Sequence, residues 1–387
     1  AKIKGAPAGV KGISLFVVPK FHVDENGDPG ERNGVSLAGL IHKLGYRGTT
    51  STALSFGDDA PCHGYLVGEP HQGLKYMFQM MNEARIGVGM GAAVIGYRGY
   101  MHSLEYAKDR LQGRKASEKN PESPQVPIID HADVRRMLLA QKAYSEGGLA
   151  LCLYGARLMD EQHTHPDEQK RAEAGKLLDL LTPVIKAWPS EFGPKANDLA
   201  IQVYGGAGYT REYPVEQCWR DNRLNPIHEG TNGIQALDLL GRKIWQDQSH
   251  GLQLLMQEMQ ADLQAATTDR CQQWALSLSE TLQQAVKVTQ SLGKSLMGGE
   301  VDKTLANASC YLHLFGHIVV AWMWLRQANA AANALASANS DSERNFYQGK
   351  LQAAQYFFHW ELPTVAQDLV LLRNQDDTCL NMKADWF

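Results

Sequence analysis

Apolar residues that recur every three or four positions occupy most of the chain beyond residue 72, and this pattern restricts the fold to one dominated by helices. The first segment, Gly73 to Gln112, is long enough for one helix of about 60 Å or two in series. Segments with the same pattern follow at 130–160, 172–186, 190–204, 215–221 and 229–245. Pro183 lies near the end of the segment 172–186, and Pro189 lies between it and the segment 190–204. Because proline interrupts the helical hydrogen-bond ladder, we expect separate helices there.

The first seventy residues have a different character. Ile13–Pro19 and Thr49–Phe56 are short runs with strand-like composition, and Asn26–Gly30 between them has turn chemistry. We predict three or four β-strands in this region, too few to bury both faces of a sheet. The chain starts without a methionine and on loop-like sequence, so we interpret it as a fragment.

Composition narrows the class of protein. Of 387 residues, 38 are Lys or Arg and 42 are Asp or Glu, so no basic excess favours binding to a polyanion. The apolar runs are shorter than the roughly 20 residues that span a bilayer, and the six cysteines never form CxxC. We therefore expect a cytoplasmic protein that neither spans a membrane nor binds nucleic acid or a metal.

The charge and composition change after Gln246. Residues 246–387 are rich in Ala, Gln and Leu, and carry 9 Lys and Arg against 14 Asp and Glu. Helical patterns cover 249–267, 270–296, 301–337 and 342–374. We predict three regions: a partial β-domain at 1–70, a helical domain at 71–245, and an acidic helical extension at 246–387. The fold class is α+β and mostly α.

One glycine motif has two interpretations. Gly87-Val88-Gly89-Met90-Gly91-Ala92 matches G-x-G-x-x-A, which binds dinucleotides when a strand leads into a tight turn and a helix. Here the motif lies inside a long helical pattern. We therefore expect its glycines to let another helix approach closely.

The segment Ile201–Lys243 combines glycines, charges and aromatic residues and is not a simple amphipathic helix. Pro226 precedes His228-Glu229-Gly230-Thr231-Asn232, where the last helix of this region begins. A glutamate at a helix N-terminus has a structural explanation, because a carboxylate there complements the helix dipole. The same terminus also offers free N–H groups and a hydroxyl, which make a site for an anion or a carbonyl group.

This segment closely resembles the C-terminal signature of the FAD-dependent acyl-CoA dehydrogenases. The matching residues are Gln202, Gly205, Gly206, Gly208, Tyr209, Glu212, Pro214, Glu216, Arg220, Asp221, Glu229, Gly230 and Thr231. Upstream matches in the same order and spacing are Gly12–Pro19, Lys43–Arg47, Met81–Arg85 and Arg110–Gly113. The extension and the enlarged loop 115–127 are similar to the larger bacterial subgroup that includes 3-methylmercaptopropionyl-CoA dehydrogenase. In this family about 200 further residues precede the matched part.

The resemblance implies a reaction. Glu229 is by similarity the base that removes the α-proton of an acyl-CoA thioester while the β-hydrogen leaves as hydride to the flavin, giving the 2-enoyl-CoA. Such a base works only if aligned donors hold the developing enolate oxygen, a role implied for the Glu229 N–H. Substrate and flavin desolvate the carboxylate, whereas the helix N-terminus favours its charged form.

The resemblance also assigns binding residues. Arg110 corresponds to an arginine that contacts the FAD pyrophosphate, and Gln202 and Gly206 correspond to residues that reach the FAD of a neighbouring subunit, which implies a homodimer. Gly205 is a further expected cofactor-binding residue. Thr231 and Asn232 are expected on the cofactor's phosphate or adenosine side. The expected substrate-binding residues are Asn82, Arg85 and Gly230. For Arg85 a salt bridge on a helix face is the alternative. The family further implies electron-transfer flavoprotein as the electron acceptor.

Two other functions are also compatible with the sequence. The family contains alkylation-response flavoproteins that associate with DNA, but the acidic extension opposes a DNA-binding face. A catalytically silent assembly subunit is the second alternative, and the retained Glu229 speaks against it.

Overall fold

The computed structural model describes the backbone of all 387 residues and every side chain except those of Gln79 and Asn82. Asn82, one of the predicted substrate-binding residues, therefore lies outside the described side chains. The chain divides into two compact units, residues 1–84 and 85–387. Strands occur only in the first unit, within the described backbone, and helices dominate the second. The predicted fold class, α+β and mostly α, is confirmed.

The described backbone of the first unit contains six short strands in three antiparallel pairs. The pairs are β1 (Leu15–Val17) with β6 (Tyr65–Val67), β2 (Phe21–Val23) with β3 (Pro29–Arg32), and β4 (Val35–Leu40) with β5 (Thr52–Phe56). The predicted turn joins β2 to β3, where Asp24 Oδ1 accepts the backbone N–H of Asn26 and of Asp28. Our count of three or four strands was too low, because segments of three or four residues are too short to show alternation.

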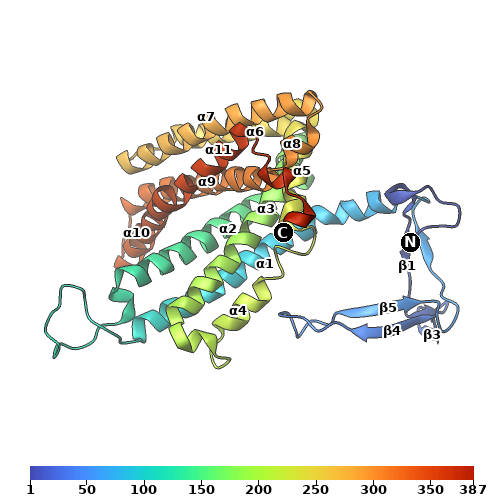
Figure 1. Ribbon diagram of the computed structural model, residues 1–387, viewed down its shortest axis with the longest axis horizontal. Helices are drawn as coiled ribbons and strands as arrows, with labels where there is room; N and C mark the ends of the chain where they lie inside the picture. The colour runs from blue at the N-terminus through green and yellow to red at the C-terminus, as the bar shows by residue number, and fades with distance from the viewer. The chain divides into compact units, whose positions relative to one another are not determined.

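The second unit is a helical bundle built on three long helices (Figure 1). They are α1 (Gly73–Asp109, which begins in the first unit), α2 (Ala132–Thr164) and α3 (Glu168–Tyr204). Of the two alternatives for the first segment, one long helix is present. The shorter helices α4 (Val215–Asn222) and α5 (Asn232–Gly241) follow, with 3₁₀ turns at Ile128–Asp130, Gly205–Tyr209 and Lys243–Ser249.

The two helices predicted around Pro183 and Pro189 are a single helix, so that prediction was wrong. α3 continues through both prolines and through Pro194. Burial on all sides stabilises it: every residue from 180 to 190 is buried, and Leu181, Val184 and Ile185 are completely so. The Ser190 hydroxyl donates to the Lys186 carbonyl at 2.5 Å, a local bond near a position where proline removes a backbone donor.

α1 and α3 run parallel and approach closely along their length. A Cβ at Gly89 would lie 2.0 Å from the Ile185 carbonyl oxygen, and one at Gly96 would lie 3.2 Å from Gly193 Cα. Further along, the Tyr106 and Tyr204 rings stack with centroids 4.1 Å apart. The glycine motif therefore lies within a helix, as expected, and Gly89 is its close-approach residue.

The remaining helices form the C-terminal extension. They are α6 (His250–Gln264), α7 (Asp269–Met297), α8 (Val301–Leu305), α9 (Ala308–Leu335), α10 (Asp341–Tyr356), α11 (Ala366–Asn374) and α12 (Thr378–Asn381). A π-helical turn (Phe357–Glu361) and a 3₁₀ turn (Leu362–Val365) connect α10 to α11, and a 3₁₀ turn at Ala384–Trp386 ends the chain. One hydrophobic core includes Leu180 of α3, Leu239 of α5 and Val320 of α9. The extension thus shares its core with the preceding helices, and the boundary near 246 stays a prediction from sequence.

α9 is the central helix of this shared core. Trp322 and Trp324 are completely buried, and their indole N–H groups donate to Asp262 of α6 and to the Ala143 carbonyl of α2. α9 is long and apolar enough to cross a bilayer by length and composition alone, but 83% of its most apolar window is buried inside the bundle. Burial to this extent is typical of a helix in the core of a folded protein, so α9 is a core helix of the bundle.

The contact between α1 and α3 yields a stability prediction. We expect Gly89→Ala to destabilise the protein by about 1–3 kcal/mol or more, because the added methyl group overlaps the α3 backbone. The matched control is Gly87→Ala, where a Cβ meets nothing within 4 Å and helix propensity predicts a gain of about 0.5–1 kcal/mol. Chemical unfolding measures the stability of both variants relative to wild type. Equal stabilities for the two variants would contradict the packing described here.

Candidate active site

The turn before α5 has an unusual backbone conformation. Glu229 has φ 54° and Gly230 has φ 88°, so two consecutive residues adopt positive φ. This conformation is costly for a residue with a side chain, and it persists only where the surroundings enforce it. The chain then enters α5 through Thr231, whose side chain accepts the Ile234 N–H at 3.4 Å as the N-cap.

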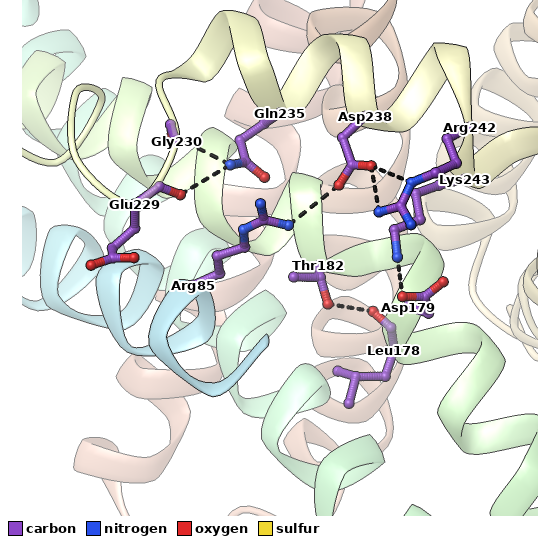
Figure 2. Close-up of polar contacts among 10 residues, drawn as sticks. All are labelled: Arg85, Leu178, Asp179, Thr182, Glu229, Gly230, Gln235, Asp238, Arg242 and Lys243. Carbon is purple, nitrogen blue, oxygen red and sulfur yellow. Dashed lines mark hydrogen bonds and ion pairs between the residues drawn. The ribbon is translucent and has the colours of Figure 1, made fainter. Parts of the chain in front are cut away.

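The side chain of Gln235 in α5 fixes the conformation of this turn by hydrogen bonds. Its side chain is completely buried, and Nε2 donates to the carbonyl oxygens of Glu229 at 3.2 Å and Gly230 at 3.3 Å (Figure 2). A Cβ at Gly230 would lie 2.6 Å from the same Nε2 atom, so glycine is required there by both space and conformation. Gln235 thus compensates for the strained conformation of the turn.

The turn presents the chemical groups that the sequence predicted. The Glu229 side chain is exposed, and Figure 2 shows its carboxylate directed away from Gln235. Within the described part of the chain this carboxylate forms no hydrogen bond or ion pair. The backbone N–H groups of Glu229, Gly230 and Thr231 likewise donate to no described group. A carboxylate beside unpaired N–H donors at a helix N-terminus is able to accept a proton next to a bound carbonyl or anion.

Arg85 of α1 lies beneath α5 and is 8% exposed. Its Nη1 pairs with Asp238 Oδ2 at 3.3 Å, and Asp238 also pairs with Arg242 at 2.7 Å (Figure 2). Its Nε is buried without a partner among the described residues. The salt bridge expected as the alternative for Arg85 is therefore present, and its substrate-binding role stays a prediction.

Sequence reasoning missed Lys186 of α3, which the structure places beside this turn. Lys186 is completely buried, and its Nζ donates to Asn232 Oδ1 at 3.4 Å. Asn232 in turn donates through Nδ2 to Glu191 Oε2 at 3.3 Å. The sequence signal that could have found it is a single lysine within the apolar stretch of residues 183–189, because lysine is rarely buried.

Burial changes the ionisation of two groups here. Burial, with a smaller contribution from the Arg85 charge and against the opposing effect of Glu229, lowers the pKa of Lys186 from 10.5 to about 8. Burial also lowers the pKa of His228; the Lys186 charge acts in the same direction, and Glu229 opposes it. These shifts place Lys186, His228 and Glu229 within one electrostatic environment.

Lys186 predicts a specific pH dependence of stability. Between pH 8 and 10.5 the unfolded chain holds the lysine proton that the folded chain has lost, so this residue makes stability rise with pH. We expect Lys186→Met to remove this rise and to increase stability at pH 7 by on the order of 3 kcal/mol. The difference in unfolding free energy between variant and wild type, measured from pH 7 to 10.5, checks it. A difference independent of pH would refute this explanation.

The support from Gln235 is also testable. We expect Gln235→Leu to destabilise the protein by about 1–3 kcal/mol, because two carbonyl groups of the turn lose their donor. Gln217→Leu is a suitable control, since Gln217 is exposed on α4 and should change stability by less than about 0.5 kcal/mol. Thermal unfolding of both variants separates the two expectations.

The other predicted cofactor residues lie at the far end of the long helices. The Tyr106–Tyr204 stack, together with a hydrogen bond from the Tyr204 hydroxyl to the His102 carbonyl at 3.2 Å, fixes the C-terminal ends of α1 and α3 side by side. The predicted cofactor residues lie next to this contact in the sequence and are exposed. Arg110 follows Tyr106 by four residues, Gln202 precedes Tyr204, and Gly205-Gly206 follow it. From Arg85 to the end of α1 the helix rises about 36 Å, so this group is well separated from Glu229.

These residues fit a phosphate-containing cofactor. The guanidinium of Arg110 and the carboxamide of Gln202 have no partner within the described residues and are exposed. A Cβ at Gly205 or Gly206 meets nothing within 4 Å, and Gly205 has φ 60°, so the backbone there is open to close approach. A free guanidinium beside open backbone suits a pyrophosphate.

Comparison with known proteins identifies the class. Residues 71–244 match the family profile "Acyl-CoA dehydrogenase, C-terminal domain", and residues 255–383 match "Acetyl-CoA dehydrogenase C-terminal like". A broad-specificity linear acyl-CoA dehydrogenase of Mycobacterium tuberculosis is 34% identical over 99% of this chain and 64% of its own length. The 3-methylmercaptopropionyl-CoA dehydrogenase of Ruegeria pomeroyi is 36% identical over 92% of this chain and 59% of its own length.

Solved structures agree in fold. ACDH-11 of Caenorhabditis elegans superposes with a TM-score of 0.73 at 19% identity, over 94% of this chain and 57% of its own. An acyl-CoA dehydrogenase of Bacillus anthracis, solved with FAD, gives a TM-score of 0.67 at 19% identity, over 87% and 56%. The fold and the matched profiles define a mostly helical C-terminal domain of the acyl-CoA dehydrogenase type. The chain belongs to the acyl-CoA dehydrogenase family, and it spans 59–64% of the length of the curated relatives named above.

Proposed function

We propose that this chain is the C-terminal part of an FAD-dependent acyl-CoA dehydrogenase that converts an acyl-CoA to the 2-enoyl-CoA in the bacterial cytoplasm. The observation that carries the proposal is the turn before α5, where the unpaired Glu229 carboxylate lies beside unpaired backbone N–H groups. This turn belongs to a chain whose relatives are named as acyl-CoA dehydrogenases. The six free cysteine thiols are typical of a reducing compartment.

Glu229 is the proposed base. An α-proton of a thioester is weakly acidic, so its removal needs a carboxylate in reach and donors at the carbonyl oxygen. The strained turn places both groups on one short segment: the side chain of Glu229 takes the proton, and the Glu229 N–H holds the oxygen as negative charge develops there. Gln235 keeps the segment rigid by binding its two carbonyl groups.

FAD, when bound, supplies the acceptor for the β-hydrogen and its electron pair. Thr231 and Asn232 would hold it on the α5 side, and Arg110, Gln202, Gly205 and Gly206 would hold its phosphate and adenosine groups. About 36 Å of helix separates these two groups of residues within one chain. That separation supports a homodimer in which each chain completes its partner's cofactor site.

The names of the relatives support a substrate class. Two relatives are butyryl-CoA dehydrogenases of Syntrophomonas wolfei at 32% and 30% identity, and the M. tuberculosis relative is named for linear acyl chains. We therefore propose a short or linear acyl-CoA as substrate, with Asn82, Arg85 and Gly230 on the CoA side. Electron-transfer flavoprotein is the proposed acceptor, from the family alone.

The test is flavin reduction in the protein made from its complete coding sequence. We expect butyryl-CoA to bleach the visible flavin band without an external acceptor, and Glu229→Gln to reduce the bleaching rate by at least 10³-fold, because the base contributes a factor of this size. Glu280→Gln, which changes an exposed carboxylate on α7, is the control and should retain bleaching. Flavin binding without bleaching by any acyl-CoA would favour a non-dehydrogenase flavoprotein instead.

A further inference from the structure

A buried lysine without a strong partner is the feature that the proposed reaction leaves unexplained. Lys186 lies in the middle of α3, where a Cβ at Gly89 of α1 would be 3.4 Å from its Cα. Its side chain is completely buried, and its ammonium group has one long hydrogen bond, 3.4 Å to Asn232 Oδ1. An ammonium group has three protons to donate, so this environment satisfies it poorly.

Such a residue lowers stability unless its charge has a use. Burying an ammonium group with incomplete compensation costs free energy, and a methionine of similar volume would avoid this cost. The contrast with Lys243 is informative. Lys243, also buried, pairs directly with Asp179 at the opposite end of α5 (Figure 2). Lys186 instead has no carboxylate partner among the described residues.

The charged groups around Lys186 leave Glu229 as its available counter-charge. From α1 comes Arg85, which repels Lys186 and is already paired with Asp238 of α5. On α3 itself, Glu191 is paired with Lys195 and reaches Asn232. On α9, His313 pairs with Asp368 at 2.6 Å. The loop adds His228, which the Lys186 charge disfavours in its protonated form, and Glu229, whose charge acts favourably on Lys186.

We propose that Lys186 is a positioning residue for Glu229: through Asn232 it holds a buried positive charge behind the catalytic turn, so that Glu229 stays ionised when substrate covers it. The inference rests on the proposed function. Desolvation by a bound substrate favours protonation of a carboxylate, and a fixed cation close by opposes that change. Lys186 thereby determines the lowest pH at which the Glu229 carboxylate is ionised and able to accept the proton.

The first test is the pH profile of kcat for the FAD-loaded enzyme, because kcat reports the ionisation of groups in the enzyme–substrate complex. We expect Lys186→Met to move the acidic limb to higher pH by about one unit, because one positive charge near the carboxylate is lost. Lys186→Arg should keep the limb within a few tenths of a unit. The difference in rate between Lys186→Met and wild type should disappear above about pH 9, where the wild-type lysine is itself neutral.

Two control variants separate this role from a structural one. Lys243→Met removes a buried lysine from the far end of α5, so it should change stability without moving the acidic limb. His228→Asn should leave the limb in place, which excludes His228 as the titrating group. An unshifted limb in Lys186→Met would overturn the inference, and the proposed function would stand as long as Glu229→Gln slows bleaching by about 10³-fold or more. Bleaching of Glu229→Gln at close to the wild-type rate would instead reject the proposed function.

A second test needs no cofactor. If Lys186 and Glu229 attract each other, then Glu229→Gln should lower the pH at which stability begins to rise, because the lysine loses its proton more easily without the carboxylate. Glu105→Gln, an exposed residue of α1 paired with Lys108, should leave that pH unchanged. An identical onset in wild type and Glu229→Gln would show that the two side chains do not interact.

Discussion

The parallel contact between α1 and α3 is the constraint on which the rest of the second unit depends. Gly89 allows the two backbones to meet at Ile185, and the same register continues to the stack of Tyr106 on Tyr204. Because both helices are rigid over this length, one contact sets the position of residues at each end. Arg85 and Lys186 are thereby brought to the α5 turn, and Arg110 and Gly205 both follow the Tyr106–Tyr204 contact at the other end.

The turn before α5 combines strain with support. Glu229 adopts a positive φ that a residue with a side chain rarely populates, and one completely buried side chain, Gln235, binds the carbonyl groups of both Glu229 and Gly230. A side chain from within the following helix therefore determines how the segment ahead of it is folded. Rigid placement of the proposed base on an element terminus agrees with the general need to preorganise a reacting group.

Much of this arrangement was accessible from sequence, and the exceptions have physical reasons. The helical periodicity predicted α1 and α2, and the ordered motifs around Gln202 and Glu229 predicted the family. The break expected at Pro183 and Pro189 was wrong, because burial on every side of α3 outweighs two lost hydrogen bonds. Lys186 was missed because a single lysine in an apolar run has no periodic signature; only the fold shows that it lies beside Asn232.

The core shared by α3, α5 and α9 has a consequence for how the helical unit loses its structure. Leu239 of α5 and Val320 in the extension belong to the same packed interior, and the Trp324 indole donates to the backbone of α2. A smaller cluster around Tyr100 and Val203 belongs to the first half alone, but the main core is common to both halves, so opening one half exposes the apolar interior of the other. Residues 85–387 should therefore melt in a single cooperative calorimetric transition, and truncation near residue 246 would leave an aggregation-prone remnant.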